Sequence, residues 1–194
     1  TGSDCTAVGL QALYENTTGI NNIAMGRNAL YANTTGTRNT AIGYAALTAN
    51  TTASYNSAFG MNALANNTTG GTNTACGYDS LSANTTGSYN TAVGYGALDA
   101  NTTGPHNTAV GRDALGVNTT GTQNIAVGNY SLDACTTGDH HVAVGYGALT
   151  SLTTAEDCTA MGTDAGGDVT TGDNNTCIGA YAGRYWTGAA QGNT

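Results

Sequence analysis

The 194-residue chain has few charged side chains and no long apolar run. Only 8% of its residues are charged, and 12 acidic residues against 4 basic ones give a net charge of −8. Because so few side chains are basic, we expect neither nucleic acid nor an anionic membrane surface as a partner. No apolar run approaches the roughly 20 residues that cross a bilayer as a helix, so we expect no membrane insertion.

The sequence also lacks the patterns that signal catalysis or a bound metal. It has no Ser/His/Asp set, nucleophile elbow or phosphate-binding loop. The adjacent His140 and His141 have no second cluster at metal-ligand spacing, and the four aspartates between residues 157 and 173 match no calcium loop. We therefore expect no enzyme, no cofactor and no metal site.

A 17-residue unit fills almost the whole chain. The unit from Asn90 to His106 is typical, and its residues are numbered as positions 1 to 17. In this numbering the first complete unit begins at Cys5. Position 5 is glycine in all eleven copies: Gly9, Gly26, Gly43, Gly60, Gly77, Gly94, Gly111, Gly128, Gly145, Gly162 and Gly179. A repeat that keeps its phase without insertions predicts rungs that stack on their neighbours, which is a solenoid and not a globule.

The alternation inside one unit predicts an all-β rung. Positions 1 to 4 read as a short strand in which positions 2 and 4 share a face, and positions 7 to 10 read as a second strand. Glycine at position 5 permits a bend, and Asn-Thr-Thr-Gly at positions 12 to 15 is typical of a turn. We expect the core at positions 4 and 9, from Val8, Ile42, Val93, Val110, Val127 and Val144 and from Leu13, Leu30, Leu47, Leu64, Leu81, Leu98, Leu115, Leu132 and Leu149.

Stacking in register would place identical side chains in files along the rod. The position-1 asparagines, such as Asn90 and Asn107, would form an amide ladder along one edge. The position-13 threonines, from Thr17 to Thr187, would form a hydroxyl file. Seven Asn-Thr-Thr sequences also match the N-glycosylation pattern, but N-glycans would crowd at strand spacing. We consider O-glycans at Thr17, Thr34, Thr51, Thr68, Thr85, Thr102 and Thr119 as an alternative.

The five cysteines occupy four different slots of the repeat. Cys5 and Cys158 stand at position 1, Cys177 replaces an alanine, Cys76 takes position 4 and Cys135 takes position 12. Such scatter indicates small buried hydrophobic residues more than a disulfide framework. Cys158 and Cys177 lie on adjacent rungs and form the one pair that could bridge.

The repeat changes character near the C-terminus. We divide the chain into a regular array, residues 1–157, with nine copies from residue 5, and two divergent repeats, residues 158–194, that lead into a further region. Trp186, Tyr185 and Tyr181 lie together in the last copy, either as a transition to that region or as a ligand surface for sugar. The termini match the end and the start of a repeat, as expected for a segment of a longer protein or a continuing fibre.

Two large apolar side chains per rung are a small core for 17 ordered residues, so we expect several chains to pack around a shared axis as a homotrimer, intertwined or side by side. Asn124–Gly128 and His141–Gly145 resemble the Ser-Val-Ala-Ile-Gly core of the YadA-like head repeats of trimeric autotransporter adhesins. Asn39–Leu47 followed by Asn-Thr-Thr resembles tail-fibre-domain repeats of bacteriophages and some environmental bacteria. The resemblance implies a trimeric left-handed parallel β-roll, although units of that adhesin family are usually a few residues shorter.

These observations favour a structural role outside the cell. The leading hypothesis is a rigid spacer or attachment rod in a phage tail fibre or bacterial surface adhesin, with a cell-surface glycan or a protein as its receptor. A second hypothesis is an extracellular filament of rods joined end to end, with a glycan coat. A third is a regular threonine surface that binds ice or carbohydrate.

Overall fold

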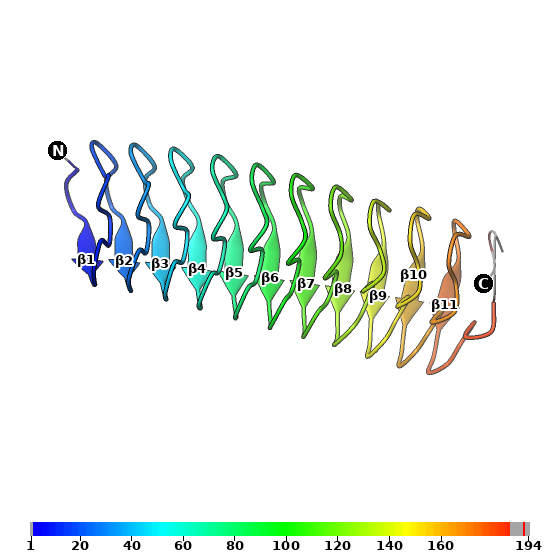
Figure 1. Ribbon diagram of the computed structural model, residues 1–194. Helices are drawn as coiled ribbons and strands as arrows, with labels where there is room; N and C mark the ends of the chain where they lie inside the picture. Colours follow the sequence, from blue (N-terminus) through cyan, green and yellow to red (C-terminus); the bar gives the residue numbers. More distant parts are fainter. Residues whose placement is uncertain (1, 187–191, 193–194) are drawn as a thin grey trace.

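The computed structural model describes residues 2–186 and 192 as one stack of similar rungs (Figure 1). Each repeat contributes one three-residue strand from positions 2 to 4. The strands are β1 (Thr6–Val8), β2 (Ile23–Met25), β3 (Thr40–Ile42), β4 (Ser57–Phe59), β5 (Thr74–Cys76), β6 (Thr91–Val93), β7 (Thr108–Val110), β8 (Ile125–Val127), β9 (Val142–Val144), β10 (Thr159–Met161) and β11 (Thr176–Ile178). The chain is an all-β parallel β-solenoid with 17-residue rungs, which confirms the architecture expected from the repeat.

The eleven strands form a single parallel sheet in chain order. Neighbouring strands pair without any shift, so that Ala92 of β6 lies beside Ala109 of β7. The same register joins β10 to β11, where Ala160 lies beside Cys177, and the sheet therefore continues past residue 157. Identical repeat positions therefore form columns along the rod, and successive residues of one column are about 4.8 Å apart.

The strands face the interior with the opposite phase to the one we expected. The position-3 alanines are fully buried from Ala24 to Ala160, whereas the position-4 side chains are exposed or half-buried. The expectation that position 4 forms the core is therefore wrong for Val8, Ile42, Val93, Val110, Val127 and Val144. Leucine and asparagine side chains fill the thin interior, and only a small residue fits beneath them at position 3.

The expected second strand is also absent from the described rungs, because positions 6 to 11 form consecutive turns. Positions 7 and 9 adopt left-handed backbone conformations, and Leu98 at position 9 has a φ of 52°. This conformation costs a non-glycine residue on the order of 1 kcal/mol. It places the leucine inside the rung: Leu30 to Leu149 are fully buried, and Leu13 in the first rung is half-buried.

The glycine at position 5 lies where the backbones of consecutive rungs approach closely. Gly94 has a φ of 140°, and a Cβ atom added to it would collide with the carbonyl oxygen of Gly111 in the next rung. The N–H of Gly111 donates to the carbonyl of Val93 at 2.8 Å, so the two backbones cannot move apart without losing the ladder. The constant glycine therefore serves both a backbone conformation and a close contact.

Candidate functional site

The asparagines at position 12 form a buried ladder through the rod. Asn84 Nδ2 donates to Asn67 Oδ1 at 2.8 Å and to the carbonyl of Gly87 in its own rung at 3.0 Å. The pattern recurs in every rung whose position 12 is asparagine after the first: Asn33, Asn50, Asn67, Asn84, Asn101 and Asn118. These six side chains are fully buried with their amide hydrogens in use, which leaves no room for an N-glycan.

A second amide ladder occupies position 1. Asn90 Oδ1 accepts the backbone N–H of Asn107 at 2.9 Å, and Asn90 Nδ2 donates to the carbonyl of Gly104 at 2.9 Å. Gly104 also accepts from Asn101, so one carbonyl closes its rung through two side chains. These asparagines are buried, and not at an edge as the sequence suggested.

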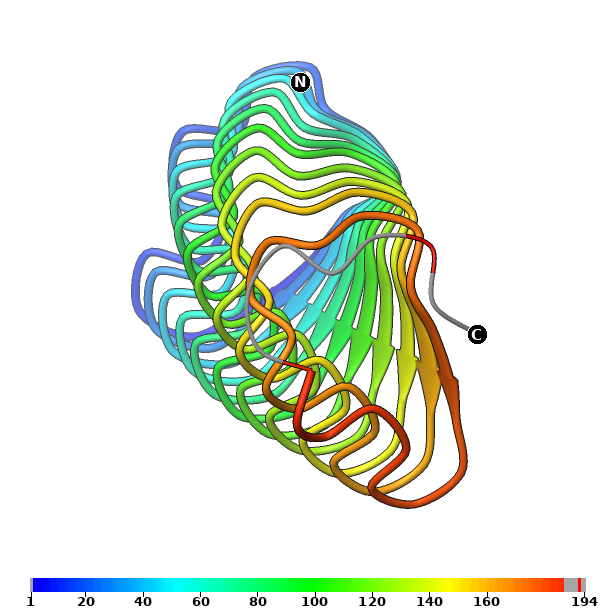
Figure 2. The same ribbon diagram turned by 90° about the vertical axis from the view of Figure 1, so that its right-hand side faces the viewer.

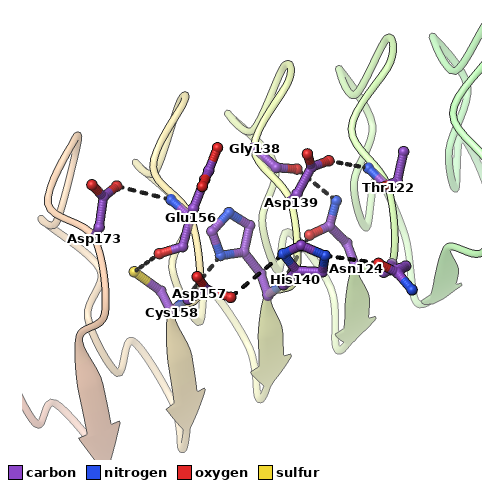
Figure 3. Close-up of polar contacts among 11 residues, drawn as sticks. Thr122, Asn124, Gly138, Asp139, His140, Glu156, Asp157, Cys158 and Asp173 are labelled. Atoms are coloured by element: carbon purple, nitrogen blue, oxygen red, sulfur yellow. Dashed lines mark hydrogen bonds and ion pairs between the residues drawn. The ribbon is translucent and has the colours of Figure 1, made fainter.

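The position-1 ladder changes chemistry in the ninth and tenth rungs (Figure 3). His141 replaces asparagine, its N–H donates to Asn124 Oδ1 at 2.9 Å, and its Nδ1 accepts the N–H of Cys158 at 3.2 Å. The ring is fully buried, and burial lowers the pKa of His141, with the nearby Ala155 carbonyl acting in the opposite direction. The imidazole thus replaces the acceptor oxygen of the amide, whereas its buried Nε2 has no hydrogen-bond partner among the described residues.

The neighbouring His140 lies outside the rod. Its Nε2 lies 2.7 Å from Gln123 Oε1, and its Nδ1 lies 3.4 Å from Asp157 Oδ1. The acidic side chains here serve the loop backbone, since Asp139 Oδ1 accepts the N–H of Thr122 at 2.6 Å (Figure 3). Among residues 2–186 and 192, no three His, Cys, Asp or Glu side chains are grouped to hold a metal ion.

The outward face of the sheet carries no charged side chain. We name it the sheet face, and it comprises positions 2 and 4 of strands β1 to β11. Position 2 carries Thr, Ile, Val or Ser, and position 4 carries Val, Met, Ile, Phe or Cys. Phe59 is 39% exposed and Met161 is 46% exposed. Position 4 thus forms an exposed or half-buried apolar column, whereas position 2 is Thr or Ser in eight of the eleven strands.

The structure separates the three aromatic residues expected to form a ligand surface. Trp186 stands in the position-12 column and packs partly buried against the core, where it lies close to Gly183. Tyr185 is exposed, and Tyr181 lies beneath the guanidinium of Arg184, 5.1 Å from the ring centroid. The tryptophan therefore packs against the core from the last described rung and is not part of an exposed aromatic cluster.

The two threonines of each Asn-Thr-Thr turn differ in their contacts. Position 13 donates its hydroxyl to the position-13 carbonyl of the next rung, as Thr102 does to Thr119 at 3.0 Å. This holds for Thr17, Thr34, Thr51, Thr68, Thr85, Thr102 and Thr119, our earlier candidates for O-glycans. Thr187, the last of that file, lies outside the described residues, as do the repeat ends at Thr1, Asn193 and Thr194.

The five cysteines are all free thiols, including Cys158 and Cys177, the one pair that could have bridged. Burial raises the pKa of the Cys135 thiol to about 11 and that of Cys158 above its ordinary value. Both groups are therefore protonated and unreactive at neutral pH. Cys135 follows Asn118 in the position-12 column, and Cys158 follows His141 in the position-1 column.

The described part of the chain contains neither a pocket nor a helix long and apolar enough to cross a membrane. No family model, curated protein or solved structure matches the sequence.

Proposed function

We propose that this chain is a structural rod, a rigid spacer or attachment segment of an extracellular fibre. The proposal extends to the fibre class that the repeat resembles: phage tail fibres and bacterial surface adhesins with YadA-like heads. The observation that carries it is the sheet face, an uncharged surface with an apolar position-4 column along all eleven strands of a solenoid.

Stiffness follows from the number of bonds between rungs. In the middle of the rod, consecutive rungs share backbone hydrogen bonds, two amide ladders and a threonine hydroxyl bond. These bonds lie at different points around the rung. Bending the rod in any direction therefore stretches the bonds on its outer side. Such a structure suits a spacer that holds a receptor-binding or anchoring domain at a distance.

The sheet face supports self-association into a homotrimer. Isoleucine, valine, methionine and phenylalanine side chains on it lose water when covered, at roughly 25 cal/mol per Å². A second copy of the chain has the same rise per rung, so its position-4 column matches this one along the full length. No other partner acquires that match without repeating at the same interval.

Two other roles have less support. Filaments of rods joined end to end would use the same stiffness, and they differ from the trimer in having no fixed mass. Ice or carbohydrate binding by the position-13 threonines is disfavoured because their hydroxyls donate within the rod.

Light scattering after size exclusion tests the proposal directly. We expect a mass near three times the 19.3 kDa of one chain. The double variant Val93→Lys/Val144→Lys places two charges on the sheet face, three rungs apart, and should give a folded monomer. The control Thr72→Lys/Gln123→Lys has the same rung spacing at exposed position 17 and should remain a trimer.

A monomeric native rod would contradict the trimer. Dissociation of both double variants would show that added charge, and not the sheet face, controls assembly. Mass that rises with concentration would favour the filament.

A further inference from the structure

Position 14 is threonine in ten of the eleven repeats, the exception being Gly188 in the last one, and the fold gives this threonine no evident role. It is exposed in all ten described copies: Thr18, Thr35, Thr52, Thr69, Thr86, Thr103, Thr120, Thr137, Thr154 and Thr171. Other exposed positions vary freely: position 6 is Leu, Arg, Tyr, Met, Asn, Thr or Ala, and position 17 varies as widely. Exposure alone therefore does not account for a threonine in ten of eleven copies.

The side chains at positions 12 and 13 of the same turn make hydrogen bonds within the rod, and the side chain at position 14 makes none among the described residues. Asn101 at position 12 lies in the buried ladder, and the Thr102 hydroxyl donates to the next rung. The Thr103 hydroxyl makes no hydrogen bond within the described residues, and neither do its nine counterparts. The N–H of Thr103 donates to the Thr119 carbonyl, but any residue except proline provides that bond.

The N-glycosylation pattern does not explain this threonine either. Position 14 is the threonine of each Asn-Thr-Thr sequence, so a need for N-glycans would keep it only where position 12 is asparagine. Thr137, Thr154 and Thr171 remain in rungs whose position 12 is cysteine, leucine or valine. The threonine thus persists where no acceptor asparagine exists.

We propose that the position-14 threonines are O-glycosylation sites. The threonine Oγ1 attacks the anomeric carbon of a nucleotide-activated sugar held by a glycosyltransferase. The carbon–oxygen bond to the nucleoside diphosphate breaks, the diphosphate leaves, and the hydroxyl proton passes to a base of the transferase. The resulting ether oxygen cannot donate a hydrogen bond, which costs nothing at position 14 but would break the ladder at position 13.

The arrangement also limits the kind of glycan. Neighbouring threonines of the column are about 4.8 Å apart, close to the thickness of a pyranose ring. Single sugars or unbranched chains can stack at this interval, whereas branched glycans would collide. Figure 2 shows these turns on the side of the rod away from the strands, so the sugars leave the sheet face free.

The test is peptide mapping of the protein purified from the cells that make it, with a fragmentation method that keeps sugars attached. Chymotrypsin is suitable because tyrosine and leucine recur along the rod. We expect sugar mass on position-14 threonines, including Thr137 and Thr154, and none on position 13 or on the buried asparagines. Unmodified native protein, or sugar confined to position 13 or 12, would overturn the proposal.

Matched variants made in the same cells separate modification from folding. Thr103→Val should lose one sugar unit while the melting temperature of the protein stripped of sugar stays unchanged. Thr102→Val should keep the sugar at Thr103 but melt at a lower temperature, because it loses the bond to Thr119. A Thr103→Val protein that keeps the full sugar mass would contradict the assignment, whatever the oligomeric state of the rod.

Discussion

The first seven rungs and the last four share one backbone but have different interiors. From Asn33 to Asn118 the position-12 column is a hydrogen-bonded amide ladder, and beyond it the same column holds Cys135, Leu152, Val169 and Trp186. Strand register and the glycine contacts continue through the change. The backbone therefore defines the rung, and the interior can be filled with amides or with apolar side chains.

Glycine replaces the position-9 leucine in the last two rungs. The leucine column ends at Leu149, and glycine follows it at Gly166 and Gly183. A Cβ atom on Gly166 would lie 2.8 Å from Leu149 Cδ2, and one on Gly183 would lie 3.0 Å from Trp186. Large side chains at position 12 or from the neighbouring rung thus occupy the space that the position-9 leucine fills elsewhere.

The largest effect is expected where the two regions are alike. Gly94→Ala forces a Cβ atom against the Gly111 carbonyl and adds backbone strain at a φ of 140°, so we expect a loss of more than about 3 kcal/mol in unfolding free energy. Gly179→Ala is the control, because its Cβ atom would meet only Ala182 Cβ, at 4.0 Å. Thermal unfolding followed by circular dichroism measures both, and equal losses would show that strain alone requires the glycine.

The amide interior should not accept single apolar residues. Asn84→Leu leaves Asn67 Oδ1 without its donor and Asn101 Nδ2 without one of its two acceptors, and we expect a loss of about 3 kcal/mol. Asn66→Leu is the matched control, since Asn66 is exposed and loses only one exposed hydrogen bond, to the Ser82 carbonyl at 3.0 Å, so we expect a loss of about 1 kcal/mol or less. If Asn84→Leu is as mild as Asn66→Leu in denaturant unfolding, the ladder contributes little to stability.

Acid should destabilise the rod at its ninth rung, where His141 replaces the position-1 asparagine. Burial holds the pKa of His141 below its ordinary value of about 6.5. Below that pH the unfolded chain therefore binds a proton at His141 that the folded chain does not bind. The stabilising contribution is complete above about pH 6.5 and falls by up to about 1.4 kcal/mol per pH unit as pH drops towards the folded-state pKa.

The control for this effect is His141→Asn, which restores the amide of the earlier rungs. Its difference from the native protein should grow as pH falls from 7 to 5 in denaturant titrations. Parallel stability curves for the two proteins would rule out His141 as the source of any acid sensitivity.

The sequence predicted the rung length, the parallel stack and the burial of the leucines, because a strict period imposes them. It did not predict which strand face points inward. Hydrophobicity favoured position 4, yet a thin interior admits only the alanine at position 3. Constancy would have been the better guide, since buried position 3 is alanine in ten of eleven copies while exposed position 4 takes five residue types. The prediction of a second strand at positions 7 to 10 was wrong because the position-9 leucine adopts a left-handed backbone conformation, which an alternating pattern does not reveal.

The smallest effect is expected where one interior is extended into the other. Asn118 Oδ1 is buried without a hydrogen-bond partner, because Cys135 follows it in the column. Cys135→Asn would supply that oxygen with a donor and bond the Gly138 carbonyl, but it moves the unpartnered oxygen to the new residue, beside Leu152. We therefore expect a change of less than about 1 kcal/mol, towards higher stability.

The double variant Cys135→Asn/Leu152→Asn should gain no more, because the ladder then ends against Val169 and the buried leucine is lost. A large loss from Cys135→Asn alone would show that the junction is fixed by packing of the thiol, and that the two interiors cannot be exchanged one rung at a time.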